Sequence, residues 1–383
     1  MAAASGSSSR PSWTNLAPDL LGLVLARLPS HVDRVRVSAV CPAWRSSARL
    51  QGPLPTLLPW LGLGDGAFLS LPDGAIIHRL PVPDDVLCQV STGSALYLVH
   101  ADGSRSLMRL SSSAATALAV VVPEYFRFEI KSLHKHLAQN IRKAVVSDHL
   151  SAVLIRSKVR ISGSVMLSTR KPQRRVTTSR SPVSVWHHSL GGTNKVIADI
   201  AIFKGELYEL TTGQELFVLN HRRRLETDKS CIPGVPWQSP NRLVKKKYYL
   251  VVSADQLLMV KRVISLAPAF QQPASRFEVF EATNLRSGHG RWRKVDNLNG
   301  RALFISEGCS QSLPATTIGV REDCIYFVAE GNNTSYSGKK IHEGPFLDSG
   351  VYNMREQTTT PLPFETVRAA HRGPLSSTWI FPE

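Results

Sequence analysis

The chain has 383 residues and a formal net charge of +17, from 46 Lys and Arg against 29 Asp and Glu. Hydrophobic residues make up 43% of the sequence and charged residues 20%, which excludes an intrinsically disordered chain and is typical of a globular protein. At this length we expect about two or three domains.

The cysteines and the N-terminus indicate where the protein resides. The five cysteines form no CxxC pair, which favours a reducing compartment over a disulfide framework or a zinc site. Residues 1–12 are small and polar, so we expect a disordered tail and no signal peptide. The longest apolar run, around 114–122, is too short to cross a bilayer. We therefore predict an intracellular protein of the nucleus or cytoplasm, not secreted and without a membrane partner.

Residues 13–50 have the pattern of a small helical module. Pro18 suits the first turn of a helix, and Asp19 places a negative charge at the positive helix end. Apolar residues then recur at helical spacing: Leu20, Leu21, Val24, Leu25 and Leu28.

Pro29 ends this first predicted helix, and Ser30 with Asp33 forms a capping-box pattern for a second helix. Pro42 interrupts the second helix before a third short turn at 43–45. A module this small buries too little apolar surface to be stable alone, so it packs on the rest of the chain, on a partner, or on both.

After residue 66 the pattern changes to β. Two apolar runs separated by a Gly or Asp turn recur at 67–80, 95–110, 200–219 and 248–260, followed by single strands up to 350–354. Several strands carry an aliphatic residue followed by Tyr: Tyr97, Tyr208 and Tyr326. Such repetition predicts a mainly β fold, an irregular β-propeller-like domain behind the helical module.

Two further segments carry structural predictions. Residues 51–66 are rich in Pro, Leu and Gly, so we expect an ordered connector. The one helical pattern after the first module lies at 131–145, where apolar residues share one helical face: Leu133, Leu137, Ile141, Ala144 and Val145.

The positive charge is concentrated between residues 149 and 198, where Asp and Glu are absent. Nine basic residues lie there: Arg156, Lys158, Arg160, Arg170, Lys171, Arg174, Arg175, Arg180 and Lys195. Three interpretations stay open: a solvated loop, a contact for an acidic protein, or a nucleic-acid or nuclear-import patch. The clusters Arg222–Arg224 and Lys245–Lys247 are predicted to be exposed loop charges between strands.

No catalytic pattern stands out in the sequence. It contains no HExxH, GxSxG or GxxxxGK[ST] motif, and the pairs His134/His136 and His187/His188 have no evident third ligand nearby. We therefore predict a non-catalytic protein without cofactor or metal.

Three ordered submotifs resemble an F-box. They are Leu16-x-Pro18-Asp19-Leu20-Leu21, Val24-Leu25-x-x-Leu28-Pro29 and Val40-Cys41-x-x-Trp44-Arg45, with Ala17 between the usual adjacent Leu and Pro. The resemblance implies docking on a Skp-type adaptor and, through it, on a cullin-based ubiquitin ligase core. The residues that the resemblance assigns to adaptor binding are Leu16, Pro18, Leu20, Leu21, Leu25, Leu28, Val40, Cys41 and Trp44.

The later strands resemble the plant F-box proteins whose C-terminal part is the domain of unknown function DUF 295, a kelch-like, propeller-related domain. The matching segments include 257–262, 277–280, 301–306, 324–327 and 378–382. The implied organisation is a tail at 1–12, an F-box at 13–50, a connector at 51–66 and a kelch-like substrate-recognition domain at 67–383. The basic segment 149–198 is divergent within it.

Together these features predict the substrate-receptor subunit of an SCF-type (Skp–cullin–F-box) E3 ubiquitin ligase, with the β domain binding a target protein. Two alternatives stay open. One is a propeller scaffold whose F-box has lost adaptor binding, which Ala17 allows. The other is a basic nucleic-acid-binding or chromatin-associated scaffold without a ligase role, using residues 149–198.

Overall fold

The computed structural model describes a large part of the 383-residue chain, in segments separated by short and long gaps. The described residues are 13–28, 31–51, 59–62, 67–70, 76–79, 83–93, 95–102, 105–109, 118–121, 141–147, 150–156, 163–169, 184–187, 196–219, 229–235, 244–265, 274–286, 289–316, 320–328, 349–362 and 378–381.

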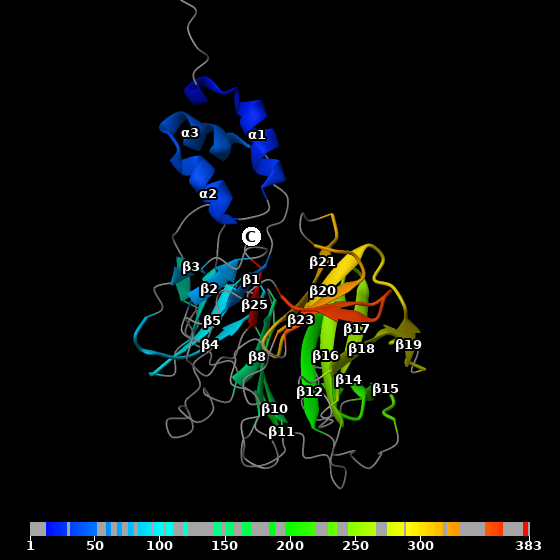
Figure 1. Cartoon of the computed structure of the whole chain (residues 1–383). Helices are drawn as coiled ribbons and strands as arrows, with labels where there is room; N and C mark the ends of the chain where they lie inside the picture. Colours follow the sequence, from blue (N-terminus) through cyan, green and yellow to red (C-terminus); the bar gives the residue numbers. More distant parts are fainter. Residues whose placement is uncertain are drawn as a thin grey trace, which may run out of the picture.

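The N-terminal module contains one 3₁₀ turn and three α-helices, drawn together in blue in Figure 1. Their bounds are η1 Trp13–Asn15, α1 Pro18–Arg27, α2 His31–Ala39 and α3 Pro42–Leu50. The helix α1 begins at Pro18 with Asp19 in its first turn, as predicted. The predicted cap Ser30 lies outside the described residues.

The third element is a full helix, where the sequence predicted only a short turn. Cys41 takes the N-cap position of α3, and its thiol accepts a hydrogen bond from the backbone N–H of Trp44 (3.4 Å). Pro42 occupies the first turn of this helix, where its missing N–H costs little. The proline thus starts a helix as well as ending the one before it.

The helix α3 packs against both α1 and α2. Long-range hydrogen bonds reinforce this arrangement: Gln51 Nε2 donates to the Pro18 carbonyl (2.9 Å) and Trp44 Nε1 to the Trp13 carbonyl (2.8 Å). Arg34 is buried, and its Nε donates to the Leu28 carbonyl at the end of α1 (2.8 Å). These bonds tie the three helices into one unit.

In the described part of the rest of the chain, strands form six sheets, which we call blades 1 to 6. Blade 1 contains β25 (Thr378–Ile380), β1 (Trp60–Gly62), β2 (Ala67–Ser70) and β3 (Ile76–Arg79). Blade 2 contains β4 (Val86–Ser91), β5 (Ala95–His100), β6 (Arg105–Arg109) and β7 (Leu118–Val121). Blade 3 contains β8 (Ile141–Val146), β9 (Leu150–Arg156), β10 (Gly163–Thr169) and β11 (Ser184–His187).

Blade 4 contains β12 (Ile197–Phe203), β13 (Glu206–Thr211), β14 (Leu216–Leu219) and β15 (Lys229–Ile232). Blade 5 contains β16 (Val244–Ser253), β17 (Gln256–Ser265), β18 (Ala274–Thr283) and β19 (Arg291–Val295). Blade 6 has five strands in the order β21 (Ser310–Pro314), β20 (Arg301–Ile305), β22 (Cys324–Phe327), β23 (Gly350–Asn353) and β24 (Thr358–Thr360). Neighbouring strands are antiparallel, except that β20 and β22 are parallel.

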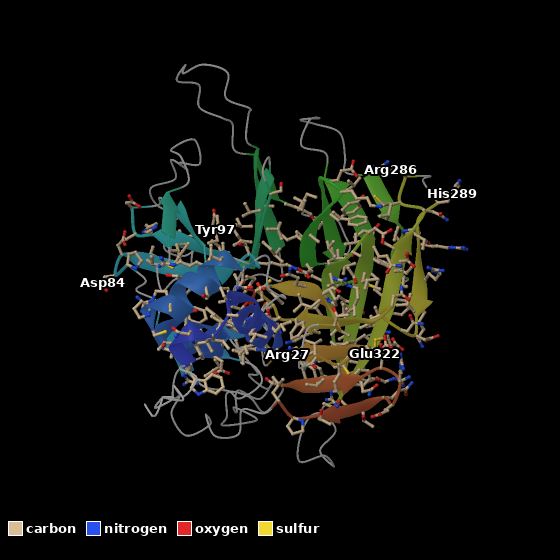
Figure 2. The ribbon with its side chains drawn as sticks, turned by 90° about the horizontal axis from the view of Figure 1, so that it is seen from above. Arg27, Asp84, Tyr97, Arg286, His289 and Glu322 are labelled. Atoms are coloured by element: carbon tan, nitrogen blue, oxygen red, sulfur yellow. The ribbon has the colours of Figure 1, made fainter. Side chains whose placement is uncertain are left out.

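The blades follow one another around a ring, so the fold is a β-propeller (Figures 1 and 2). Contacts link β25 to β4, β4 to β8, β8 to β12, β12 to β16, and β16 to β21. Each of these strands is the edge strand named first in its blade. Apolar side chains fill the spaces between neighbouring blades. The predicted mainly β, propeller-like class with an N-terminal helical module is confirmed.

The two ends of the propeller close the ring within blade 1. The C-terminal strand β25 pairs antiparallel with β1, with Leu61 opposite Trp379. The Trp379 side chain is fully buried, and its Nε1 donates to the Ile305 carbonyl in blade 6 (3.1 Å). The Phe381 backbone N–H donates to the Gly93 carbonyl that follows β4 (2.9 Å). One short strand therefore joins blades 6, 1 and 2.

Three of the sequence predictions need comment. The helix predicted at 131–145 is wrong where the chain is described, because residues 141–146 form β8. A register shift between Ile141 and Lys143 brings Ile141 and Ala144 into the same interblade cluster. These two apolar residues are three positions apart, which is also the spacing of residues on one helix face. Residues 131–140 lie outside the described part.

Lys245–Lys247 are not loop residues, because they belong to β16 and pair with β17; Lys245 and Lys246 are exposed. Arg222–Arg224 lie outside the described residues. Trp60–Gly62, within the predicted connector, form the strand β1. In the described part of the chain, no helix has the length and apolar character needed to cross a membrane.

Candidate docking surface and the comparisons with known proteins

The helix α1 separates its apolar residues onto two sides. Leu21 and Leu25 are buried, with 0% and 1% of their surface exposed. Leu20, Leu23 and Val24 are 52%, 54% and 42% exposed. With 100° between successive residues, positions 20, 23 and 24 form one continuous stripe, and positions 21 and 25 lie on another side. We call Leu20, Leu23 and Val24 the α1 stripe.

The nine predicted adaptor-binding residues therefore have different structural roles. Leu21 and Leu25 belong to the core of the module. Pro18, Leu20 and Val40 are exposed, and Leu16, Leu28, Cys41 and Trp44 are half-buried. Cys41 caps α3 and the Trp44 indole binds the Trp13 carbonyl, so these two residues also hold the module together.

Four exposed apolar residues of the module were not among the nine predicted adaptor-binding residues: Trp13, Leu23, Val24 and Leu50. Leu23 belongs to the α1 stripe, and Trp13 is 77% exposed. A signal for Leu23 exists in the sequence, because positions 20, 23 and 24 follow the i, i+3, i+4 rule of a single helix face. Trp13 has no such periodic signal, because it lies in the 3₁₀ turn before α1.

Several exposed apolar side chains on so small a unit are unusual for a module that packs only on itself. Leu20, Leu23, Val24 and Val40 can contribute apolar area to an interface, and Arg27 is exposed at the end of α1 (Figure 2). An amphipathic helix that lays an apolar stripe into a partner groove is a recurrent mode of recognition. The arrangement of exposed apolar side chains supports binding to a partner.

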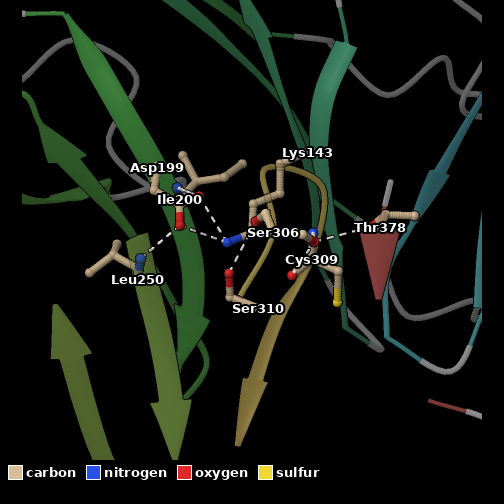
Figure 3. A network of polar contacts seen from close by, with 8 residues as sticks. All are labelled: Lys143, Asp199, Ile200, Leu250, Ser306, Cys309, Ser310 and Thr378. Carbon is tan, nitrogen blue, oxygen red and sulfur yellow. Dashed lines mark hydrogen bonds and ion pairs between the residues drawn. The ribbon is translucent and has the colours of Figure 1, made fainter. Parts of the chain in front are cut away.

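The propeller has its own polar cluster, buried at the first strands of three blades (Figure 3). Lys143 of β8 forms an ion pair with Asp199 of β12 (2.8 Å), and both side chains are about 5% exposed. The Asp199 carboxylate also accepts hydrogen bonds from the backbone N–H groups of Leu250 in β16 (2.7 Å) and Ile200 (2.8 Å). One carboxylate thus connects blades 3, 4 and 5.

This cluster has the properties of a structural element. Burial raises the pKa of the Asp199 carboxyl, and Lys143 with the two amide donors opposes that rise. Nearby, burial raises the pKa of the Cys309 thiol to about 11, which leaves it protonated and unreactive. A carboxylate already bound by one cation and two amides has little capacity left for proton transfer.

A helical module with an exposed apolar stripe, joined to a closed β-propeller, defines a class of binding protein with two separate parts. Residues 68–353 match the KIB1-4 beta-propeller family. Because the match covers more than half of the chain, the chain belongs to this family.

Three relatives from Arabidopsis thaliana span almost the whole chain. This chain is 22% identical to the putative F-box/kelch-repeat protein At5g24040, over 90% of this chain and 94% of that protein. It is 23% identical to the F-box protein SKIP23, over 90% of this chain and 89% of that protein. It is 21% identical to the F-box/kelch-repeat protein At1g64840, over 87% of this chain and 89% of that protein. The resemblance to plant F-box proteins with a propeller is thereby confirmed.

Proposed function

We propose that this chain is the non-catalytic substrate-receptor subunit of an SCF-type E3 ubiquitin ligase. In this proposal the helical module docks on a Skp-type adaptor, which links it to the cullin core, and the propeller holds a target protein. The chain then acts by proximity, because it keeps the target close to a ubiquitin-charged enzyme and raises the effective concentration of the two reactants.

The observation that carries the proposal is the α1 stripe. The module places Leu21 and Leu25 in its core and leaves Leu20, Leu23 and Val24 exposed, as a helix that docks on a partner requires. The names of the Arabidopsis relatives, which contain "F-box", support the same assignment. Ala17 is the N-cap of α1 and makes no side-chain capping bond, so its insertion leaves the helix start intact.

The test is retention of a purified plant Skp-type adaptor by the full-length chain, followed by reconstitution with the cullin core. We expect a stable complex of chain and adaptor. A correctly folded wild-type chain that fails to retain the adaptor would overturn the proposal and favour a scaffold without ligase role.

The nucleic-acid alternative depends on residues 149–198, of which the structure describes 150–156, 163–169, 184–187 and 196–198. Among these described residues, no feature favours the nucleic-acid alternative over the proposed adaptor binding. A salt titration with generic DNA tests this alternative directly, because phosphate binding by basic residues weakens steeply as salt rises.

A further inference from the structure

Blade 5 is longer than the blade that precedes it. Its strands β16, β17 and β18 each contain 10 residues, whereas the strands of blade 4 contain between 4 and 7. The hydrogen bond from Leu250 to Asp199 aligns β16 with β12. Because β12 begins only two residues before Asp199 and β16 begins six before Leu250, the start of β16 extends past the start of β12.

The extended end of blade 5 is basic. Lys246 and Arg276 lie in one row across the sheet, since both are in register with Val263 of β17. Side chains in register point to the same face of a sheet, so these two cations share a face, and both are exposed.

The next row on that face adds an ion pair. Lys261 and Glu278 lie opposite each other on β17 and β18, and Lys261 Nζ donates to Glu278 Oε2 (2.7 Å). Lys294 of β19 follows one row further and is exposed. We call Lys246, Lys261, Arg276 and Lys294, with Glu278 between them, the blade 5 basic face.

The electrostatics confirm that these charges act on one another. The pKa of Glu278 is lowered first by the hydrogen bond from Lys261, and Lys294 and Arg276 add to the lowering, while burial opposes it. One carboxylate among four cations leaves a surplus of positive charge on this face.

We propose that the blade 5 basic face is a docking surface for an acidic, carboxylate-rich segment of a partner protein. Opposite charges in register would steer the encounter and orient the bound segment. This inference builds on the proposed function, because the bound segment would then belong to the protein that is to be ubiquitinated.

A protein segment fits this face better than a nucleic acid. The aromatic residues of these strands are engaged in the interblade cores: Tyr248, Tyr249 and Phe277 are buried, and the half-buried Phe280 and Trp292 pack against the cluster between blades 4 and 5, so they are not free to stack on bases. Glu278 in the middle of the face also repels a continuous phosphate backbone. A peptide can place neutral residues opposite Glu278 and carboxylates opposite the cations.

The experiment uses the full-length chain and a fluorescein-labelled peptide of alternating glutamate and serine, with a glutamine analogue as the neutral probe. Binding is measured by fluorescence anisotropy over a series of salt concentrations. We expect the glutamate peptide to bind more tightly than the glutamine peptide, with an affinity that falls as salt rises. The variant Lys246→Glu with Arg276→Glu should weaken binding at least about tenfold.

The matched control is Arg286→Glu with Arg291→Glu, which reverses two exposed cations of the same blade away from the basic face; Figure 2 shows Arg286 at the outer edge of the ring. This control should retain most of the affinity. Equal binding of the two peptides, or an equal loss in both variants, would overturn the inference. Tighter binding of duplex DNA with the same loss in Lys246→Glu/Arg276→Glu would also overturn it in favour of nucleic acid. Adaptor retention is measured on the same preparations. A chain that retains the adaptor but does not bind the glutamate peptide would contradict this inference alone, whereas loss of adaptor retention would contradict the proposed function.

Discussion

Adaptor binding should depend on the α1 stripe and not on the neighbouring core leucines. The perturbation that tests this is Leu20→Asp with Val24→Asp, because these two side chains are 52% and 42% exposed and lie on the stripe. Leu25→Asp is unsuitable as a docking mutation, because Leu25 is only 1% exposed and its replacement would disrupt the module itself.

The expected magnitude follows from the exposure of the two side chains. Burying a whole Leu or Val side chain contributes about 1.5–3 kcal/mol, so the exposed part of each contributes about 1 kcal/mol to docking. An aspartate forced into an apolar interface without a partner adds about 1–3 kcal/mol of cost at each position. The double variant should therefore lose about 4 kcal/mol or more, which corresponds to about a thousandfold weaker binding.

The assay is biolayer interferometry with immobilised Skp-type adaptor, together with far-UV circular dichroism and thermal unfolding of each variant. Ala43→Asp with Ser46→Asp is the matched control, because both residues are exposed on α3 and receive the same charges without loss of a large apolar side chain. Leu25→Ala serves as the core reference and should destabilise the module by about 2–5 kcal/mol. A folded Leu20→Asp/Val24→Asp variant that binds the adaptor like the wild type would refute the reasoning.

Three more outcomes are expected from the propeller and the cysteines. Asp199→Ala should lower the free energy of unfolding by about 3–5 kcal/mol in urea denaturation, since it leaves a buried lysine without its counter-charge, whereas the exposed Asp255→Ala should have almost no effect. Trp379→Ala should cost about 3–5 kcal/mol in the same measurement, because a fully buried side chain that closes the ring is lost; an unchanged midpoint would show that the ring closes without it. In the native chain, a thiol reagent at mildly alkaline pH should modify the half-buried Cys41 well before Cys309, whose pKa is raised to about 11, and mass spectrometry of the digest would reveal the reverse order.

Local signals in the sequence predicted much of the fold. Pro18 and Asp19 marked the start of α1, and the turn at Lys204–Gly205 marked a hairpin that the structure confirms between β12 and β13. Both signals work because a few neighbouring residues determine the backbone conformation there. Lys204 and Gly205 indeed adopt positive φ angles of 50° and 79°.

Long-range features could not be predicted in the same way. Nothing near Asp199 in the sequence indicates that its carboxylate meets Lys143 and the amide of Leu250, which are 56 and 51 residues away. The pairing of β25 with β1 joins opposite ends of the propeller. Such contacts are decided by how whole blades pack, and a periodic pattern in a short window carries no information about them.

The helical module shows why even a clear local pattern left the docking surface undetermined. Five apolar residues between positions 20 and 28 follow helical spacing, and spacing alone cannot say which of them face a partner. In the structure, α3 packs on α1, and Leu21 and Leu25 are buried whereas Leu20 and Val24 remain exposed. Of the module's side chains whose burial the structure describes, Leu21, Leu25 and Arg34 are buried. A module as short as residues 13–50 gains stability from any partner that covers Leu20, Leu23 and Val24, because binding to the folded form alone shifts the unfolding equilibrium. If the module docks as proposed, its docking and its folding are coupled, because a partner covers the exposed α1 stripe only when the module is folded.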